Sequence, residues 1–156
     1  HNGLAVRFHE EQVGSKGRDT MGVKGVTLNE GDFVVSMSVV KPGDMLLTVS
    51  ENGYGKISSV DDYRKINRGG KGVITLKTTE RNGGVIAVRK VLESDELVVV
   101  STQGKVIRIK VNEIRVTGRN AAGVRIMDLR NGDKVTALQP VSLDETEEDF
   151  LEDDDI

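Results

Sequence analysis

Short apolar runs separated by turns make up the hydrophobic pattern of the chain. Residues 105–111 alternate between apolar and basic side chains, which places Ile107 and Ile109 on one face of a predicted strand. Residues 45–49 and 96–101 are nearly continuous apolar runs, typical of strands that are covered on both faces. Turn signals containing glycine occur at residues 51–53, 81–84, 102–104 and 130–133. No stretch has a helical period, so the pattern predicts an all-β fold.

A similar unit occurs three times along the chain. Gly3, Gly53 and Gly104 open matching segments, so successive copies are offset by 50 and then 51 residues. An arginine lies fifteen residues after each of these glycines, at Arg18, Arg68 and Arg119. A Gly-Val pair follows each arginine after four more residues. Each repeat predicts about four short strands, and its length is in the range of propeller-type blades.

The repeats suggest an array of blades rather than a closed ring. Three blades are fewer than the roughly four to eight of a closed propeller. The chain therefore stacks openly, associates with itself, or is part of a longer array, and its start within a repeat favours the last. We expect a propeller-like array of three four-stranded antiparallel blades at about residues 1–32, 33–83 and 84–142, followed by a disordered acidic tail at 143–156.

The composition restricts the core and the chemistry. Aromatic residues make up 3% of the chain and tryptophan is missing, so Val, Ile, Leu and Ala must build the core. The lack of cysteine excludes a disulfide scaffold and a thiolate metal site, and it fits a reducing cytoplasm. No apolar run approaches the roughly 20 residues of a membrane span, so we expect no membrane partner.

The charge of the chain is segregated. Of the 25 acidic residues, nine lie in residues 144–156, where no basic residue occurs. Residues 1–143 therefore hold 22 basic and 16 acidic residues, a formal charge of +6. A basic body beside an acidic tail points to a polyanion as partner. Either the tail competes for the surface that binds this polyanion, or it only aids solubility.

Glycines and cations meet in residues 67–73, NRGGKGV. Glycine lets a backbone turn sharply and bring bare N–H groups close to a ligand, and basic side chains grip a phosphodiester backbone without reading its sequence. The spacing is not that of a P-loop. The equivalent loops, residues 17–22 and 118–123, retain the arginine and the last glycine but lack the central glycine pair and the lysine.

The run Arg68-Gly69-Gly70-Lys71-Gly72 closely resembles the core of the gyrase-A box, the signature of the C-terminal domain of the DNA gyrase A protein. Residues 79–83 and 118–120 also resemble this family, as does the acidic tail. The full box carries Gln-Arg-Arg before the glycines, where this chain has residues 66–68 (INR), and it belongs to a first blade that this chain lacks.

The resemblance implies a β-pinwheel, in which neighbouring blades exchange strands and six blades form a domain. It implies non-sequence-specific binding and wrapping of double-stranded DNA, which supports ATP-dependent negative supercoiling. The implied partners are the rest of the gyrase A protein and the gyrase B protein, in an A2B2 heterotetramer in the cytoplasm. ATP and magnesium would act on other domains, so no cofactor is expected here. The alternatives are the matching domain in the C protein of topoisomerase IV and a propeller-type scaffold for protein interactions.

The residues that we expect to contact DNA are glycines and cations of the loops and their flanks. They are Arg68, Lys71, Gly69, Gly70, Gly72, Arg18, Arg119, Lys24, Arg125, Arg64, Lys65, Arg115 and Lys16. For the three repeated arginines, the alternative is that they bridge neighbouring blades through backbone carbonyls. Arg7 and Arg108 occupy matching strand positions and are either DNA contacts or solvated surface charges.

We expect no catalytic residue and no metal site. Neither histidine has the spacing of a metal ligand or of a catalytic triad. Asp61 and Asp62 are predicted to form a turn at a strand end, and Tyr63 to pack in the core with Phe8 and Phe33. The role of Tyr54 is left open. The aromatic residues are too few and too scattered for stacking on single-stranded DNA.

Overall fold

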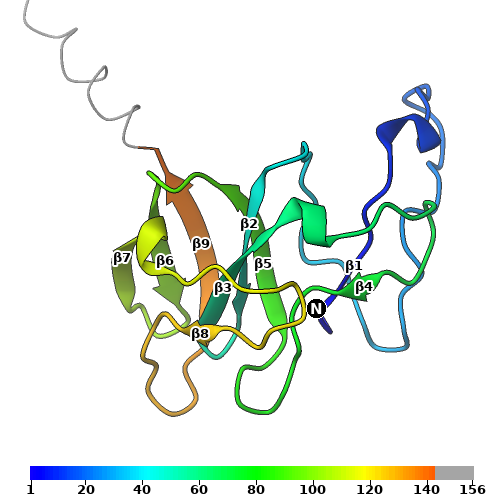
Figure 1. Ribbon diagram of the computed structural model, residues 1–156. Helices are drawn as coiled ribbons and strands as arrows, with labels where there is room; N and C mark the ends of the chain where they lie inside the picture. The colour runs from blue at the N-terminus through cyan, green and yellow to red at the C-terminus, as the bar shows by residue number, and fades with distance from the viewer. Residues whose placement is uncertain (143–156) are drawn as a thin grey trace, which may run out of the picture.

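The computed structural model describes residues 1–142 and consists of strands and short 3-10 turns (Figure 1). The strands are β1 (Leu4–Ala5), β2 (Met45–Ser50), β3 (Tyr54–Ser59), β4 (Val73–Ile74), β5 (Val85–Val91), β6 (Glu96–Ser101), β7 (Val106–Lys110), β8 (Val124–Arg125) and β9 (Val135–Val141). The 3-10 turns are η1 (Glu10–Gln12), η2 (Val60–Asp62) and η3 (Val111–Glu113). The predicted acidic tail, 143–156, lies outside the described residues. The all-β prediction is confirmed, and no helix in residues 1–142 has the length and apolarity to cross a bilayer.

Three antiparallel sheets follow one another in chain order across Figure 1. Their strand orders are β1-β4, β5-β2-β3-β8 and β7-β6-β9. Each of the first two sheets takes its last strand from the next repeat, since β4 pairs with β1 at Ile74 and Leu4, and β8 pairs with β3 at Arg125 and Tyr54. This exchange is the pinwheel arrangement that the resemblance implied.

Only the central sheet has the four strands expected of every blade. The third sheet lacks a counterpart of β8, because that strand comes from a following repeat and residues 1–142 hold no fourth repeat. The central sheet also joins β5 to β2, so it combines strands from both sides of the boundary predicted near residue 84. The blade boundaries themselves stay a prediction.

The 3-10 turns show the same periodicity as the sequence. They begin at Glu10, Val60 and Val111, with offsets of 50 and 51 residues. The amide of Val60 donates to the carbonyl of Asp44 at 2.9 Å, and the amide of Val111 donates to Asp95 in the same way at 2.9 Å. Asp61 and Asp62 lie in η2 directly after β3, so the predicted turn at a strand end is confirmed.

Aliphatic side chains form the core, as the composition requires. One cluster joins the central and third sheets and contains Leu47, Val49, Leu97 and Val99, each fully buried. Residues 46–50 of β2 are buried on both faces, as predicted. The same prediction is wrong for β6, where only alternate residues are buried, because the third sheet lies at the end of the row in Figure 1 and has a neighbour on one side.

The first repeat contains little regular structure. Residues 34–40 align with β5 and β9, but the described residues supply no counterpart of β2 to pair with them. Phe33, which was predicted to be in the core, is therefore 53% exposed, and its ring stacks on His1 with centroids 4.6 Å apart. Tyr63 is buried as predicted, and its hydroxyl lies 2.6 Å from that of Thr75.

Candidate nucleic-acid interface

Each glycine-containing loop lies against the segment that follows the equivalent loop of the preceding repeat. The amide of Gly69 donates to the carbonyl of Gly25 at 2.8 Å, and the amide of Thr27 donates to Gly70 at 2.9 Å. One repeat later, a bond between neighbouring repeats joins the amide of Lys77 to the carbonyl of Ala121 at 3.5 Å. We call residues 16–25, 66–72 and 117–123 the loop row. The repeat in the sequence thus becomes a row of loops, each tied to the repeat before it.

The arginines of the loop row bridge neighbouring repeats. Arg68 donates from Nε to the carbonyl of Gln12 at 2.9 Å and from Nη1 to that of Lys24 at 2.5 Å. Arg119 makes the equivalent bonds to the carbonyls of Asp62, at 3.1 Å, and Ile74. Both arginines therefore make the bridges through backbone carbonyls that the sequence left open as the alternative to DNA contact. A carbonyl carries only a partial charge, so the positive charge of each guanidinium stays uncompensated at the loop row.

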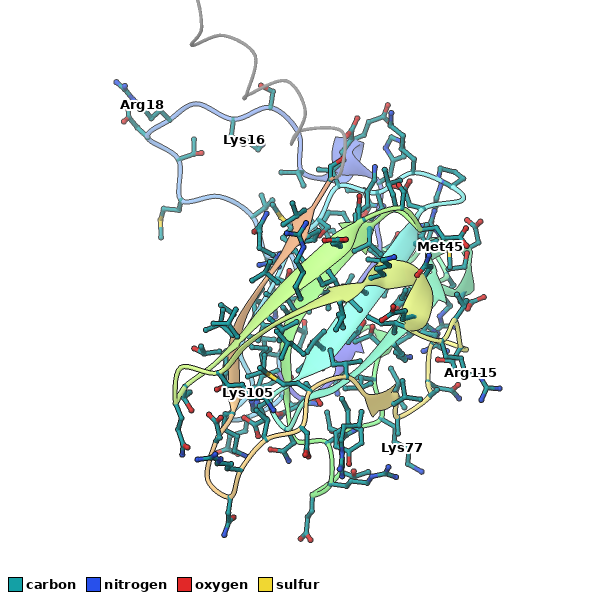
Figure 2. The ribbon with its side chains drawn as sticks, turned by 90° about the vertical axis from the view of Figure 1, so that its left-hand side faces the viewer. Lys16, Arg18, Met45, Lys77, Lys105 and Arg115 are labelled. Carbon is teal, nitrogen blue, oxygen red and sulfur yellow. The ribbon has the colours of Figure 1, made fainter. Side chains whose placement is uncertain are left out.

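The repeated position does not behave alike in all three copies. Arg18 is exposed, and its side chain has no hydrogen-bond partner among the residues that the structure describes. Figure 2 shows Arg18 and Lys16 on a loop that projects from the body. An exposed arginine on a projecting loop is open to a phosphate, whereas its two equivalents are already bound to carbonyls.

The glycines of the central loop allow backbone conformations and close approaches that other residues would not. Gly72 has a φ of +89°, and a Cβ there would lie 2.4 Å from the carbonyl oxygen of Ala5, so the loop and β1 approach too closely for a side chain. Gly69 has a φ of +82°. The amides of Gly69 and Gly70 donate to the carbonyls of Gly25 and Asn67. Two of the bare amides expected from the sequence, those of Gly69 and Gly70, are therefore already paired within the protein.

Most of the remaining predicted residues are free cations. Each is exposed, and none makes a side-chain hydrogen bond or an ion pair within residues 1–142. They are Lys16, Arg18, Lys24, Arg64, Lys65, Lys71 and Arg115. Arg64 and Arg115 are repeat equivalents, while Lys71 corresponds to Met21 and Ala122. The structure thus provides unpaired positive side chains in and beside the loops of all three repeats.

The two strand arginines that were left open have partners. Arg7 donates from Nη1 to the carbonyls of Val60, at 2.8 Å, and Tyr63, at 3.0 Å, and so forms another bridge between the first and second repeats. Arg108 forms an ion pair with Glu96 on the neighbouring strand β6. Neither is a free surface cation.

Lys56 has a structural role that the sequence reasoning missed. It is fully buried in β3, and its ammonium donates to the carbonyls of Gly118, at 2.9 Å, and Arg119. Burial and the nearby charge of Arg119 lower its pKa from 10.5 to about 8. The signal in the sequence was a lysine inside a strand at a position where the other repeats have Val6 and Ile107.

A second feature that the sequence did not reveal surrounds Tyr54, whose role had been left open. Arg81 and Arg125 both donate to its hydroxyl, at 3.0 and 3.1 Å. These bonds lower the pKa of the phenol. Arg125 was among the predicted DNA contacts, whereas Arg81 was not, because its Arg-Asn-Gly segment was assigned to a turn and to the family resemblance but not to DNA binding.

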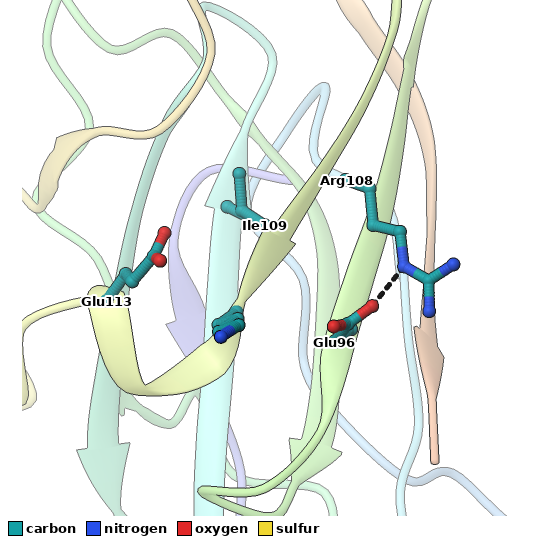
Figure 3. Close-up of a pocket in the computed structure, with 5 residues that line it drawn as sticks. Glu96, Arg108, Ile109 and Glu113 are labelled. Atoms are coloured by element: carbon teal, nitrogen blue, oxygen red, sulfur yellow. Dashed lines mark hydrogen bonds and ion pairs between the residues drawn. The ribbon is translucent and has the colours of Figure 1, made fainter. Parts of the chain in front are cut away.

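An open depression lies on the surface where β6, β7 and η3 meet (Figure 3). It has a volume of about 280 Å³ and is lined by Glu96, Arg108, Ile109, Lys110 and Glu113. The ion pair between Glu96 and Arg108 occupies one side of it. No group of three His, Cys, Asp or Glu side chains able to hold a metal ion occurs in the part of the chain that the structure describes.

Comparisons with known proteins agree with the fold. A family model described as "DNA gyrase C-terminal domain, beta-propeller" matches residues 1–41, 44–91 and 95–142. The A subunit of DNA gyrase from Chlamydia pneumoniae is 41% identical over 152 residues, which are 97% of this chain and 18% of that protein. Its counterpart from Fibrobacter succinogenes is 47% identical over 143 residues, or 90% of this chain and 16% of that protein. The chain thus spans less than a fifth of the length of these relatives.

Solved structures give the same result. A C-terminal domain of DNA topoisomerase IV superposes with a TM-score of 0.83 at 26% identity and covers 91% of this chain and 45% of that chain. A C-terminal domain of DNA gyrase A superposes with a TM-score of 0.79 at 33% identity and covers 89% of this chain and 47% of that chain.

Proposed function

Since the chain belongs to the DNA gyrase C-terminal domain family, we propose that it binds double-stranded DNA along its loop row and helps to wrap it, without itself catalysing a reaction. The observation that carries the proposal is the row of tied loops with free cations in and beside them. Because the backbone repeats, Arg68 and Arg119 hold uncompensated charge one repeat apart, and the free cations lie beside them at positions that differ between repeats. This arrangement suits phosphates that recur along a duplex and does not require a particular sequence.

Wrapping needs several such loops at once. Bending a short duplex by 40–90° costs roughly 1–6 kcal/mol, which a single loop cannot offset but a row of loops can. The contacts between neighbouring loops support this role, because the loops are tied by hydrogen bonds such as that of Gly69 to Gly25. Loops that are tied to one another resist separation when a bent duplex pulls on them.

The finer parts of the proposal concern the complete protein. We propose that this segment works with the rest of a gyrase A protein and with the gyrase B protein in the cytoplasm, in negative supercoiling driven by ATP. No cofactor is assigned to the segment itself, and ATP and magnesium act elsewhere in the complex. The alternative, a topoisomerase IV domain, is supported by the superposition at a TM-score of 0.83. Gyrase is favoured by the box-like run Arg68-Gly69-Gly70-Lys71-Gly72 and by relatives that are 41–47% identical.

The test is a fluorescence anisotropy titration of the chain with duplexes of about 40 and about 150 base pairs, the longer being close to one persistence length. Wrapping predicts tighter binding to the longer duplex than the added number of sites explains, and a slope of log K against log salt of about −0.9 for each phosphate contacted. A protein-interaction scaffold predicts no binding to either duplex. Affinity that does not change between low and moderate salt would contradict the proposal.

A further inference from the structure

Tyr54 gathers two arginines from different segments of the chain. Arg81 donates from Nε to the Tyr54 hydroxyl at 3.0 Å, and Arg125 donates from Nη2 at 3.1 Å. The guanidinium carbons lie 4.8 and 5.7 Å from the centre of the ring, within the range of a cation–π contact. Tyr54 is only 4% exposed, whereas both arginines are exposed. The buried tyrosine therefore positions two guanidinium groups at the surface.

The two positive charges are poorly compensated. Both guanidinium groups bind the same neutral hydroxyl oxygen, and their like charges repel each other. Asp128 lies 3.5 Å from Nη1 of Arg125, but its side chain is 83% exposed, so solvent screens the pair. Within residues 1–142 no carboxylate lies within 4.0 Å of Arg81. A guanidinium has five N–H donors, so the two groups have ten together. Most of these donors have no partner in the described residues.

Both arginines are held on ordered backbone. Asn82, which is buried, closes the turn after Arg81, because its Oδ1 accepts from the amide of Thr79 at 2.7 Å. Its Nδ2 donates to the carbonyl of Ala122 at 3.1 Å, which ties this turn to the loop row. Arg125 lies in β8, directly opposite Tyr54 in β3 (Figure 1). A site on two anchored segments has little backbone freedom to lose when a ligand binds.

We propose that Arg81 and Arg125, positioned by Tyr54, form a binding site for one phosphodiester group where the second and third repeats meet at the loop row. Arginine suits this ligand because its planar fork matches two phosphate oxygens. The repeat equivalents of Tyr54 are Leu4 and Lys105, so residues 1–142 hold the site once. The inference rests on the proposed function, since the phosphate belongs to the DNA that follows the loop row.

The first test compares matched arginines. Arg130 lies in the Arg-Asn-Gly turn of the third repeat, and it makes no side-chain hydrogen bond within the described part of the chain. With a duplex of about 150 base pairs, Arg81→Gln is expected to lower the salt slope by about 1, and Arg130→Gln to leave it closer to that of the wild type. The proposed site is contradicted if the salt slope of Arg81→Gln is unchanged, or if the slope drops equally in both variants. The proposed function is tested separately by whether the wild-type protein binds the duplex.

The second test needs no DNA. Arg81 and Arg125 lower the pKa of Tyr54, whereas burial raises that of Tyr63, the other tyrosine, so the two absorbance transitions separate. If inorganic pyrophosphate binds both guanidinium groups and draws them from the Tyr54 hydroxyl, the pH midpoint of the Tyr54 titration should rise. The variant Tyr54→Phe identifies which absorbance transition belongs to Tyr54. The rise is expected in the wild type and is lost in Arg81→Gln. A midpoint that pyrophosphate does not move overturns the site, and a shift without any DNA binding supports the site and contradicts only the proposed function.

Discussion

The guanidinium of Arg119 donates to the main-chain carbonyl of Ile74, one repeat earlier in the chain. Arg68 makes the equivalent bond to the carbonyl of Lys24. Arg68 and Arg119 therefore connect neighbouring repeats, whereas Arg18 at the same spacing does not within the described residues. Bare positive charge for a DNA backbone comes from neighbours of these arginines, such as Lys71, which no described residue pairs. Stability and binding should thus respond to different residues of the same loops.

Removing the bridge should destabilise the protein. Arg119→Ala leaves the carbonyls of Asp62 and Ile74 without their charged donor, and bonds to charged groups contribute about 1.5–3 kcal/mol each. Because both carbonyls are near the surface, where water replaces the donor, we expect a loss of about 1.5–3 kcal/mol in total. Urea unfolding measures it. Arg115→Ala, four residues earlier and exposed without a partner in the described chain, should change the unfolding free energy by less than about 0.5 kcal/mol.

Removing a free cation of the loop row should weaken DNA binding and leave the stability of the protein unchanged. Lys71→Ala is expected to weaken DNA binding and to reduce the salt slope by about 1, with the unfolding free energy unchanged. Lys110→Ala is the matched control, because Lys110 is exposed at the end of β7, outside the loop row, in the depression that Glu96 and Glu113 also line. Equal DNA affinities for the two variants would show that the loop row is not where the duplex lies.

Lys56 should make stability depend on pH. Its pKa is about 8 in the folded protein and 10.5 in the unfolded chain, so between these values the unfolded chain binds the additional proton. The unfolding free energy therefore rises as the pH increases from about 8 to 10.5, where the buried ammonium is relieved of its charge. The difference in unfolding free energy between the wild type and Lys56→Met isolates this group from other titrating residues. A difference that is flat across the window would contradict the assignment.

Two glycines of similar φ should tolerate alanine differently. Gly72 has a φ of +89°, and its Cβ would lie 2.4 Å from the oxygen of Ala5, whereas Gly104 has a φ of +83° and open space around it. Gly104→Ala should cost only the left-handed backbone strain of about 1–2 kcal/mol. Gly72→Ala should cost about 1–3 kcal/mol more, because β1 and β4 must move apart. Thermal or urea unfolding of the two variants gives the comparison.

Deleting residues 143–156 tests the acidic tail. The deletion removes nine of the 25 acidic residues and leaves a basic chain. If the tail competes with DNA, the shortened protein binds a duplex more tightly, most of all at low salt, where charges are least screened. The solubility alternative predicts an unchanged affinity and a protein that precipitates at lower concentration. Anisotropy at two salt concentrations, with the full chain as control, separates the two.

The sequence predicted positions better than roles. The offsets of 50 and 51 residues located the loops and the strands of each copy, because a repeated backbone needs the same turn chemistry in each copy. Phe33 was wrongly assigned to the core, since a strand's burial depends on partners that its own residues do not encode. Arg81 was missed because its partner, Tyr54, lies 27 residues away and meets it only in the fold.

The amino-acid pattern alone determined the all-β class, the three repeats and the aliphatic core, because alternation, glycine turns and the period are local properties of a chain. Only the tertiary structure decided which cations are free. Whether Arg68 or Lys71 can meet a phosphate depends on which carbonyls reach it from the neighbouring repeat, and that follows from the exchange of strands between sheets. Long-range pairing, unlike periodicity, leaves no mark on a single residue's neighbours in sequence.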